Sequence, residues 1–299
     1  MPANALVPFA QSADRFFQAQ GHRFPLGSKT YLMGILNVTP DSFSDGGKYL
    51  QLDTALRQAE KLIASGADII DVGGESTRPG YIPVPAEEEA ARVVPIIEAI
   101  SKHFPIVISV DTYKAATAAA ALAAGASIVN DISGLRSDSG MAEVIAKNNA
   151  GAVLMFHAGL PSELLSEAEQ ALTRTDWQNR MVQFLSISLQ LAEAAGIEKQ
   201  NILLDPGVGF SMTSEESIEI LRSSHFLTKF GLPVLHGTSR KRLISHILGE
   251  RAMEQRLLGT AATVCYSIVS GADFVRVHDV AEIADVTKVM DALWRKGGN

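Results

Sequence analysis

The stretch GADIIDVGGESTRPG, residues 66–80, begins with glycine, continues as an apolar run and ends in a polar segment rich in glycine. Its first part recurs as GASIVND (125–131), GAVLMF (151–156) and GADFVRV (271–277). Each of these glycines follows a segment with helical periodicity, where a left-handed cap favours a residue without a Cβ atom. The repeat therefore predicts helix, short loop and strand in regular alternation.

Eight apolar runs of this kind follow one another along the chain. The runs and the polar positions that end them are YLMGIL to Asn37, DIIDVG to Glu75, IVISV to Asp111, SIVN to Asn130, AVLMF to His157, ILL to Asp205, PVLHG to Ser239 and FVRV to His278. Continuous apolar runs are typical of parallel strands that are covered on both faces. We therefore expect an α/β fold, a (β/α)8 TIM barrel in residues 31–299 as a single domain, preceded by a short N-terminal extension at residues 1–30.

An open, doubly wound parallel sheet is the alternative architecture. It is disfavoured because neither GxGxxG nor GxxxxGK[ST] follows any of the apolar runs. The loops expected after the first, second and fifth strands are long, at residues 39–51, 75–85 and 158–175. Long loops on the C-terminal side of a barrel usually carry function.

The composition is that of an ordinary globular domain, with 299 residues, 46% hydrophobic and 20% charged. A net charge of −7 argues against binding to nucleic acid or to an anionic membrane surface. No run reaches the roughly 18 apolar residues of a membrane span, and the N-terminus lacks the pattern of a signal peptide. The single Cys265 cannot form an intramolecular disulfide, which is compatible with a reducing compartment. We expect a cytoplasmic protein in which Cys265 is a buried, unreactive thiol.

Three of the runs end in a carboxylate or an amide. Asp205 follows ILL and precedes Pro206, and a carboxylate there can accept two parallel N–H bonds from a guanidinium-like group. It could instead initiate a turn. Asp111 and Asn130 also end apolar runs, and their alternative is to cap the segment that follows.

Cationic residues end two further runs. Arg276 and His278 are two residues apart on one strand, so that both side chains face the same side and suit an anion. The alternative for Arg276 is an ion pair with Asp279 or Asp273. Lys241 stands at the expected start of a helix, where a solvated lysine is the alternative interpretation.

The motifs together resemble a known family. The matching segments are MGILNVTPDSFSDGG (33–47), DVGGESTRPG (71–80), SVDTYK (109–114), IVNDISG (128–134), LLDPGVGF (203–210), GTSRK (237–241) and RVHDV (276–280). In this order they resemble the dihydropteroate synthases, pterin-binding transferases of folate biosynthesis. The resemblance implies condensation of 6-hydroxymethyl-7,8-dihydropterin pyrophosphate with p-aminobenzoate to give 7,8-dihydropteroate and pyrophosphate. It also implies substitution at the pterin methylene carbon through a cationic pterin.

The same resemblance assigns roles to residues. The pterin would contact Asp111, Asn130, Met155, Asp205, Phe210 and Lys241. The pyrophosphate would contact Asn37, Thr77, Arg78, Arg276 and His278. The p-aminobenzoate would contact Phe43, Thr77, Arg78, Pro79 and Ser239. The resemblance further implies catalytic roles for Asn37, Lys241, Arg276 and His278, a Mg²⁺ cofactor at Asn37 and a homodimer.

Four residues depart from the family pattern, and we expect them around the p-aminobenzoate side of the site. His157 is displaced by one position, so it is expected to face away from the mouth. The other three are Met212, His236 and Arg242. These departures leave open a non-catalytic pterin-binding paralogue. A pterin-dependent methyltransferase of the corrinoid type is a further alternative, although it should not need the STRPG, SRK and RVHD segments together.

Overall fold

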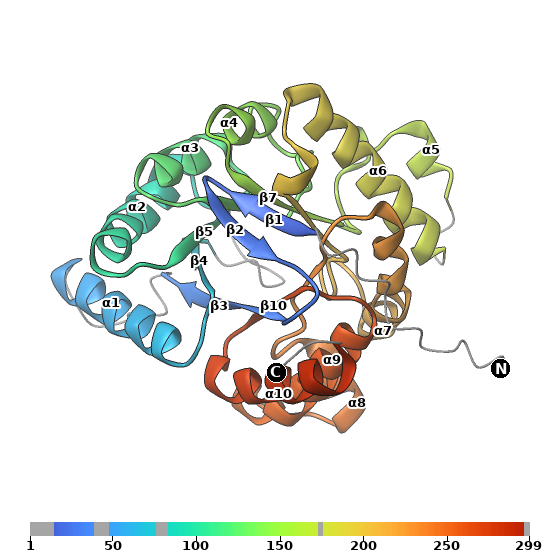
Figure 1. The fold of residues 1–299 in the computed structure, drawn as a ribbon. Coiled ribbons are helices and arrows are strands. Elements are labelled where there is room, and N and C mark those ends of the chain that lie inside the picture. Colours follow the sequence, from blue (N-terminus) through green and yellow to red (C-terminus); the bar gives the residue numbers. More distant parts are fainter. Residues whose placement is uncertain (1–14, 39–47, 76–82, 173–175, 296–299) are drawn as a thin grey trace.

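The computed structural model describes residues 15–38, 48–75, 83–172 and 176–295. Within them eight parallel strands form one sheet in the order β8-β7-β6-β5-β4-β3-β10-β9. The two ends of this sheet are joined by a bridge between Leu204 and Val234 and by a 3.0 Å hydrogen bond from the Leu204 N–H to the Pro233 carbonyl. The sheet therefore closes into a barrel, which the helices surround (Figure 1). The expected (β/α)8 architecture is confirmed.

Each of the eight apolar runs coincides with one strand of the barrel. The strands are β3 (Tyr31–Asn37), β4 (Ile69–Gly73), β5 (Val107–Asp111), β6 (Ile128–Asp131), β7 (Gly151–Met155), β8 (Ile202–Asp205), β9 (Leu235–His236) and β10 (Phe274–Val277). The helices that follow them are α1 (Lys48–Ala64), α2 (Ala86–His103), α3 (Ala115–Ala123), α4 (Met141–Lys147), α5 (Glu167–Gln170), α6 (Trp177–Ala195), α7 (Ser214–Ser223), α8 (Arg242–Leu248), α9 (Leu257–Val269) and α10 (Val280–Trp294).

Local signals fix where two of the helices begin. Helix α2 starts after Pro85 and carries three glutamates in its first turn, where the helix dipole favours negative charge. Helix α7 starts with a capping box in which the Thr213 hydroxyl accepts from the Glu216 N–H and the Glu216 carboxylate accepts from the Thr213 N–H. Both helices therefore begin where the chain leaves the C-terminal edge of the sheet.

A small hairpin covers the opposite end of the barrel. Its strands β1 (Phe16–Ala19) and β2 (His22–Pro25) pair antiparallel, and they cross the front of the barrel in Figure 1. Phe17 and Phe24 pack against Phe274 with ring centroids 5.6 and 5.8 Å apart, among the first residues of the barrel strands. The N-terminal end of the barrel is therefore filled by apolar side chains, which leaves the C-terminal end for a site.

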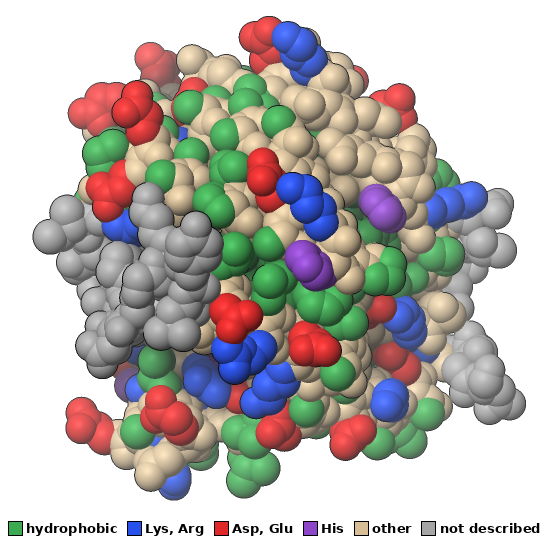
Figure 2. All heavy atoms as spheres, turned by 90° about the vertical axis from the view of Figure 1, so that its left-hand side faces the viewer, with side chains coloured by type: hydrophobic (Ala, Val, Ile, Leu, Met, Phe, Trp, Pro, Cys, Tyr) green, Lys and Arg blue, Asp and Glu red, His purple; other side chains and the backbone are tan. Residues whose placement is uncertain are grey.

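The outer surface carries charges of both signs. On the side of α1 and α2, acidic and basic side chains are interspersed (Figure 2). Some charged side chains pair along a helix, such as Lys102 with Glu98 on α2. None of the described helices combines the length and the apolar character that crossing a membrane requires. The side chain of Cys265 is partly buried on α9, so the expected full burial of this thiol is wrong.

Candidate active site

The interior of the barrel changes from apolar to polar along the strands. Near the N-terminal end, Ile69, Val107, Ile128 and Phe274 belong to one apolar cluster inside the barrel. Side chains two residues further along a strand point to the same side. The next inward positions on these strands are Asp71, Ser109, Asn130 and Arg276. Ser109 has no hydrogen-bond partner among the described residues, so it is not part of the site. Polar groups buried at this depth are costly unless they are paired, and the partners of the other three define the site.

Arg276 is the centre of this polar layer. Its Nε donates to Asp71 Oδ2 at 2.6 Å, and its Nη2 donates to Asp111 Oδ2 at 2.7 Å. Burial favours the neutral form of Arg276, but the two carboxylates outweigh burial and raise its pKa. The alternative pairing with Asp279 or Asp273 is wrong, although Arg276 does form ion pairs with two other aspartates.

Asp111 and Asn130 lie beside this arginine. Burial raises the pKa of the Asp111 carboxyl to about 7, against the opposing effect of Arg276. The Asn130 Nδ2 donates to Asp71 Oδ2 at 3.1 Å. Neither residue caps a helix, since Lys114 precedes α3 and Gly140 precedes α4. The structure therefore brings Asp111 and Asn130 to Arg276, from three different strands.

Asp205 ends β8 in a turn that requires glycine. Its Oδ1 accepts the Gly207 N–H at 2.7 Å, so the interpretation of Asp205 as a turn residue holds alongside its position at the mouth. Gly207 has φ +68°, and a Cβ atom there would lie 1.8 Å from the Phe156 carbonyl oxygen. Burial raises the pKa of Asp205 to about 6, while the Gly207 N–H lowers it. The Asp205 carboxylate is thus held rigidly at the edge of the polar layer.

Lys241 reaches the mouth across the loop that follows Asp205. Its ammonium lies 4.0 Å from the centre of the Phe210 ring, and a Cβ atom at Gly209 would lie 2.9 Å from its Cδ. Burial lowers the pKa of Lys241 to about 8, while Asp205 acts to raise it. Met155, at the end of β7, is buried. Lys241 and Phe210 therefore lie together, and Met155 lies against the turn that follows Asp205, where a Cβ atom at Gly207 would be 3.3 Å from Met155 Cγ.

Ser239 and His278 contact each other at the ends of β9 and β10. The Ser239 hydroxyl lies 3.0 Å from His278 Nδ1 and accepts the His278 backbone N–H at 3.2 Å. Arg240, between Ser239 and Lys241, has φ +57°, which is unusual for a residue with a side chain. A bidentate ion pair with Asp279 holds Arg240 in this conformation. The turn presents Ser239 and Lys241 to the mouth.

Asn37 is half-buried at the end of β3 and close to Asp111. A Cβ atom at Gly73 would lie 3.6 Å from Asn37 Oδ1 and 3.7 Å from Asp111 Oδ2. The two oxygens therefore flank a position without a side chain. The described part of the chain contains no group of three or more His, Cys, Asp or Glu side chains arranged for a metal.

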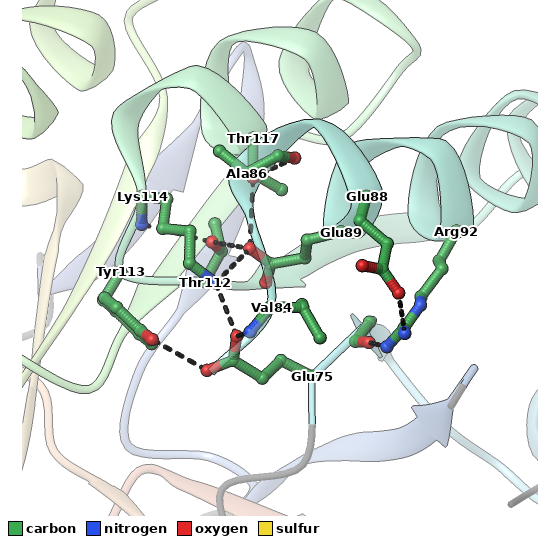
Figure 3. Close-up of polar contacts among 11 residues, drawn as sticks. Glu75, Val84, Ala86, Glu88, Glu89, Arg92, Thr112, Tyr113, Lys114 and Thr117 are labelled. Carbon is green, nitrogen blue, oxygen red and sulfur yellow. Dashed lines mark hydrogen bonds and ion pairs between the residues drawn. The ribbon is translucent and has the colours of Figure 1, made fainter. Parts of the chain in front are cut away.

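A second polar network lies next to this mouth (Figure 3). The Glu75 Oε2 accepts from the Lys114 ammonium at 2.6 Å and from the Val84 N–H at 2.9 Å, and its Oε1 accepts from the Tyr113 hydroxyl at 2.8 Å. Lys114 also donates to Glu89 Oε2, at 2.9 Å. The network ties the end of β4 to the residues before α2 and α3. Phe43, Thr77, Arg78 and Pro79 lie outside the described residues.

The four departures from the family pattern occupy different places. His157 does face the mouth, contrary to expectation: its ring centre is 6.2 Å from that of Phe210, and burial lowers its pKa. His236 is buried and follows the inward Leu235, so it points to the helices, not to the mouth. Burial lowers its pKa to about 3. Met212 packs against the core, and Arg242 is exposed on α8.

Sequence reasoning missed Asp71, which contacts both Arg276 and Asn130. It also missed Lys114, which donates to Glu75, and Glu89, the second carboxylate that Lys114 contacts. Asp71 had a recognisable signal, because it is a charged residue inside the apolar run DIIDVG and at an inward position. Lys114 and Glu89 had none, since charged residues before or within an amphipathic helix are usually solvated.

Comparisons with known proteins identify similar sequences and structures. The family described as "Pterin binding enzyme" matches residues 33–278. The dihydropteroate synthase of Bacillus subtilis is 48% identical over 270 residues, which cover 90% of each chain. The structure of a Clostridium difficile dihydropteroate synthase in the presence of pteroic acid superimposes with a TM-score of 0.84, at 44% identity over 91% of this chain and 100% of that one. The Xanthomonas albilineans dihydropteroate synthase with 4-aminobenzoic acid also gives 0.84, at 38% identity over 93% and 97%.

Proposed function

Since the chain belongs to the pterin-binding enzyme family, as one of its dihydropteroate synthases, we propose how the residues at its barrel mouth carry out the reaction. The enzyme is a transferase of folate biosynthesis that condenses 6-hydroxymethyl-7,8-dihydropterin pyrophosphate with p-aminobenzoate. The products are 7,8-dihydropteroate and pyrophosphate. The observation that carries the proposal is the convergence of Asp111, Asn130, Asp205 and Arg276 from four separate strands on one half-buried mouth.

The pterin ring binds between Asp205 and Asn130. An ionised Asp205 accepts hydrogen bonds from the 2-amino and N3 groups, which present two parallel N–H donors. Asp111 and Asn130 complete the hydrogen bonds along the other edge of the ring. Lys241 donates to the pterin carbonyl, and Met155 with Phe210 supplies apolar walls.

The pyrophosphate binds to Arg276, His278 and Asn37. Arg276 has five N–H donors and spends two of them on Asp71 and Asp111, so others remain for phosphate oxygens. His278, which follows the same strand β10, adds a further donor. Thr77 and Arg78, outside the described residues, are assigned to the same anion by the family resemblance.

A Mg²⁺ ion fits the oxygen donors on the same side. Asn37 Oδ1 and Asp111 Oδ2 flank Gly73, and Mg²⁺ is commonly held by one or two protein oxygens together with waters and substrate phosphates. When bound there, the ion neutralises charge on the pyrophosphate. The protein residues would hold and orient the pyrophosphate around it.

In the reaction, the bond between the pterin methylene carbon and the pyrophosphate oxygen breaks and a bond to the p-aminobenzoate nitrogen forms. The electron pair of the broken bond leaves with pyrophosphate, and the amine nitrogen loses one proton. Arg276 and His278 stabilise the charge that develops on the leaving group. The barrel holds the amine against the methylene carbon. Ser239 faces the p-aminobenzoate carboxylate, with Phe43, Thr77, Arg78 and Pro79 completing that side.

The test combines the purified protein, both substrates and Mg²⁺. We expect release of pyrophosphate together with formation of 7,8-dihydropteroate, and loss of activity in excess chelator. Pterin binding without condensation at saturating p-aminobenzoate would instead identify a non-catalytic paralogue. Full activity in excess chelator would contradict the role given to Asn37 and Mg²⁺.

We also propose that the enzyme is a homodimer in the cytoplasm. Two large apolar side chains are strongly exposed on adjacent helices, Leu258 on α9 at 82% and Leu293 on α10 at 77%. An interface between two copies along these helices would cover such exposed apolar side chains. Light scattering should give twice the chain mass of 32.0 kDa, and a Leu258→Asp variant should shift towards the monomer. A monomeric parent protein would overturn the proposed dimer.

A further inference from the structure

We propose that Asp71 is a positioning residue for this reaction, which orients both Arg276 and Asn130 from beneath the pterin site. Asp71 is fully buried in the middle of β4. Its Oδ2 accepts one hydrogen bond from Arg276 Nε and one from Asn130 Nδ2, at 2.6 and 3.1 Å. One carboxylate oxygen therefore connects Arg276, which is proposed to bind pyrophosphate, with Asn130, which is proposed to bind the pterin.

The contact with Asp71 fixes which way the Asn130 amide faces. An ionised carboxylate can only accept hydrogen bonds, so it selects the amide nitrogen of Asn130. The amide oxygen of Asn130 is then left as an acceptor for a ring N–H on that edge of the pterin. Without Asp71 the Asn130 amide could rotate and place its NH2 group against an N–H group of the pterin. The buried hydrogen bond between Asn130 and the pterin would then be lost.

The contact with Arg276 fixes one side of its guanidinium group, at Nε, on a fully buried carboxylate. The other side, at Nη2, contacts the less buried Asp111. Asp71 is completely shielded from solvent, whereas the side chain of Asp111 retains 10% exposure. The Nε–Asp71 bond can therefore persist while the N–H groups of Arg276 that contact neither aspartate bind phosphate oxygens. The Asp71 carboxylate thereby fixes the orientation in which Arg276 meets the leaving group.

A purely structural role does not explain this aspartate. Inward positions of a barrel strand normally carry branched apolar side chains, as Ile69 does one step below. Buried ion pairs are often no more stabilising than well-packed apolar residues. The second oxygen, Oδ1, is also buried and has no hydrogen-bond partner among the described residues, which adds a further cost. An aspartate at this position is therefore retained for the two donors that it holds.

The inference rests on the proposed roles of Arg276 and Asn130. The experiment therefore distinguishes a failure of the inference about Asp71 from a failure of those proposed roles. The variants are Asp71→Ala, Asp71→Asn, Arg276→Ala and, as a matched control, Ser109→Ala. Ser109 pairs in register with Asp71 on β5, is fully buried and has an Oγ without a hydrogen-bond partner among the described residues. Each variant is measured for kcat, for KM of both substrates, for binding of inorganic pyrophosphate with Mg²⁺ and for thermal unfolding.

We expect Asp71→Ala to lower kcat/KM for the pterin substrate ~100-fold, the scale of a misplaced catalytic group, with KM for p-aminobenzoate unchanged. Asp71→Asn should lose about tenfold, because the acceptor stays but the charge-assisted bond to Arg276 weakens. Both should bind pyrophosphate more weakly than Ser109→Ala, which should match the parent. If Asp71→Ala fails to fold, Asp71→Asn decides.

Two results would overturn the inference. One is that both Asp71 variants match Ser109→Ala in kcat, in pterin KM and in pyrophosphate binding. The other is that both KM values rise while stability falls, which would make Asp71 merely structural. If Arg276→Ala itself keeps full activity, the result contradicts the proposed pyrophosphate site. It then says nothing against the positioning role of Asp71.

Discussion

Two buried clusters near β4 and β5 each combine two carboxylates with one cation, but only one of them is fully paired among the described residues. The inner cluster combines Asp71 and Asp111 with Arg276, and the outer cluster combines Glu75 and Glu89 with Lys114. In the outer cluster the Glu75 oxygens accept from Lys114, Tyr113 and the Val84 backbone, and the Glu89 carboxylate has hydroxyl donors in addition to Lys114 (Figure 3). In the inner cluster one Asp71 oxygen has no partner among the described residues.

The electrostatics of the two clusters differ accordingly. Burial acts to lower the pKa of Lys114, yet its hydrogen bonds to Glu75 and Glu89 outweigh burial and raise it. At the inner cluster, burial wins at Asp111 and raises its pKa to about 7. The outer cluster is thus satisfied by its own residues, and the inner cluster keeps capacity for a ligand. Clusters of the second kind often mark functional sites.

The largest expected effect comes from removing the cation of the outer cluster. Lys114→Met leaves Glu75 and Glu89 buried without a countercharge, so it should lower the free energy of unfolding by ~3–5 kcal/mol. Urea denaturation measures this loss. Lys102→Met is the matched control, because Lys102 is exposed and pairs loosely with Glu98, and it should change stability by less than ~0.5 kcal/mol. Equal stability of the two variants would mean that the outer cluster is not structural.

The next largest effect is on pterin binding at the mouth of the barrel, where Asp205 lies beside the inner cluster. Asp205→Asn places an amide donor against a pterin donor, so pterin affinity should fall by ~2–5 kcal/mol. The folded protein should keep its stability, because the change removes a buried charge whose pKa burial has raised to about 6. Calorimetry with a pterin ligand and thermal unfolding measure the two quantities. Pterin binding within about threefold of the parent, under ~1 kcal/mol, would place the pterin elsewhere.

These clusters also define what the sequence alone could predict. The apolar runs located all eight barrel strands, because an inward and an outward apolar face leave a continuous pattern. The ends of those runs located Asp111, Asn130, Asp205 and Arg276 at one mouth, because parallel strands end on the same side.

The partners of these residues could not be predicted in the same way. Arg276 binds Asp71 and Asp111 from strands more than 160 positions away in the chain, and no local pattern encodes such a pairing. The outer cluster depends on the packing of α2 against α3, which brings Glu89 to Lys114. His157 was wrongly expected to face outward. It faces inward because the loop after β7 continues the alternation of the strand, in which Met155 also faces inward.

A smaller effect is expected on pyrophosphate binding by His278, which follows β10 at the mouth of the barrel. His278→Ala removes one donor to the leaving group, so the affinity for inorganic pyrophosphate should fall by ~1.5–3 kcal/mol, the contribution of a hydrogen bond to a charged group. Pyrophosphate titrations with Mg²⁺ measure this loss, with turnover measured in parallel. Asp279→Asn serves as a control for the local ion pair with Arg240, and it should reduce pyrophosphate binding less. If it reduces binding more, His278 acts only through the turn that Arg240 holds.

The smallest effect is a pH dependence that Asp111, Asp205 and Lys241 at the barrel mouth should produce and the outer cluster should not. Burial raises the pKa of Asp205 to about 6 and of Asp111 to about 7, and it lowers the pKa of Lys241 to about 8. Both aspartates must be ionised to accept from the pterin, so kcat/KM should rise with pH through about 6 to 7. Lys241 must be protonated to donate to the pterin carbonyl, so the same constant should fall above about pH 8, by up to about tenfold per unit. The Lys241→Arg variant should lose this alkaline decline, because a guanidinium stays charged. A decline that persists in Lys241→Arg, or a flat profile from about pH 5 to 9, would show that these shifted groups do not control pterin binding.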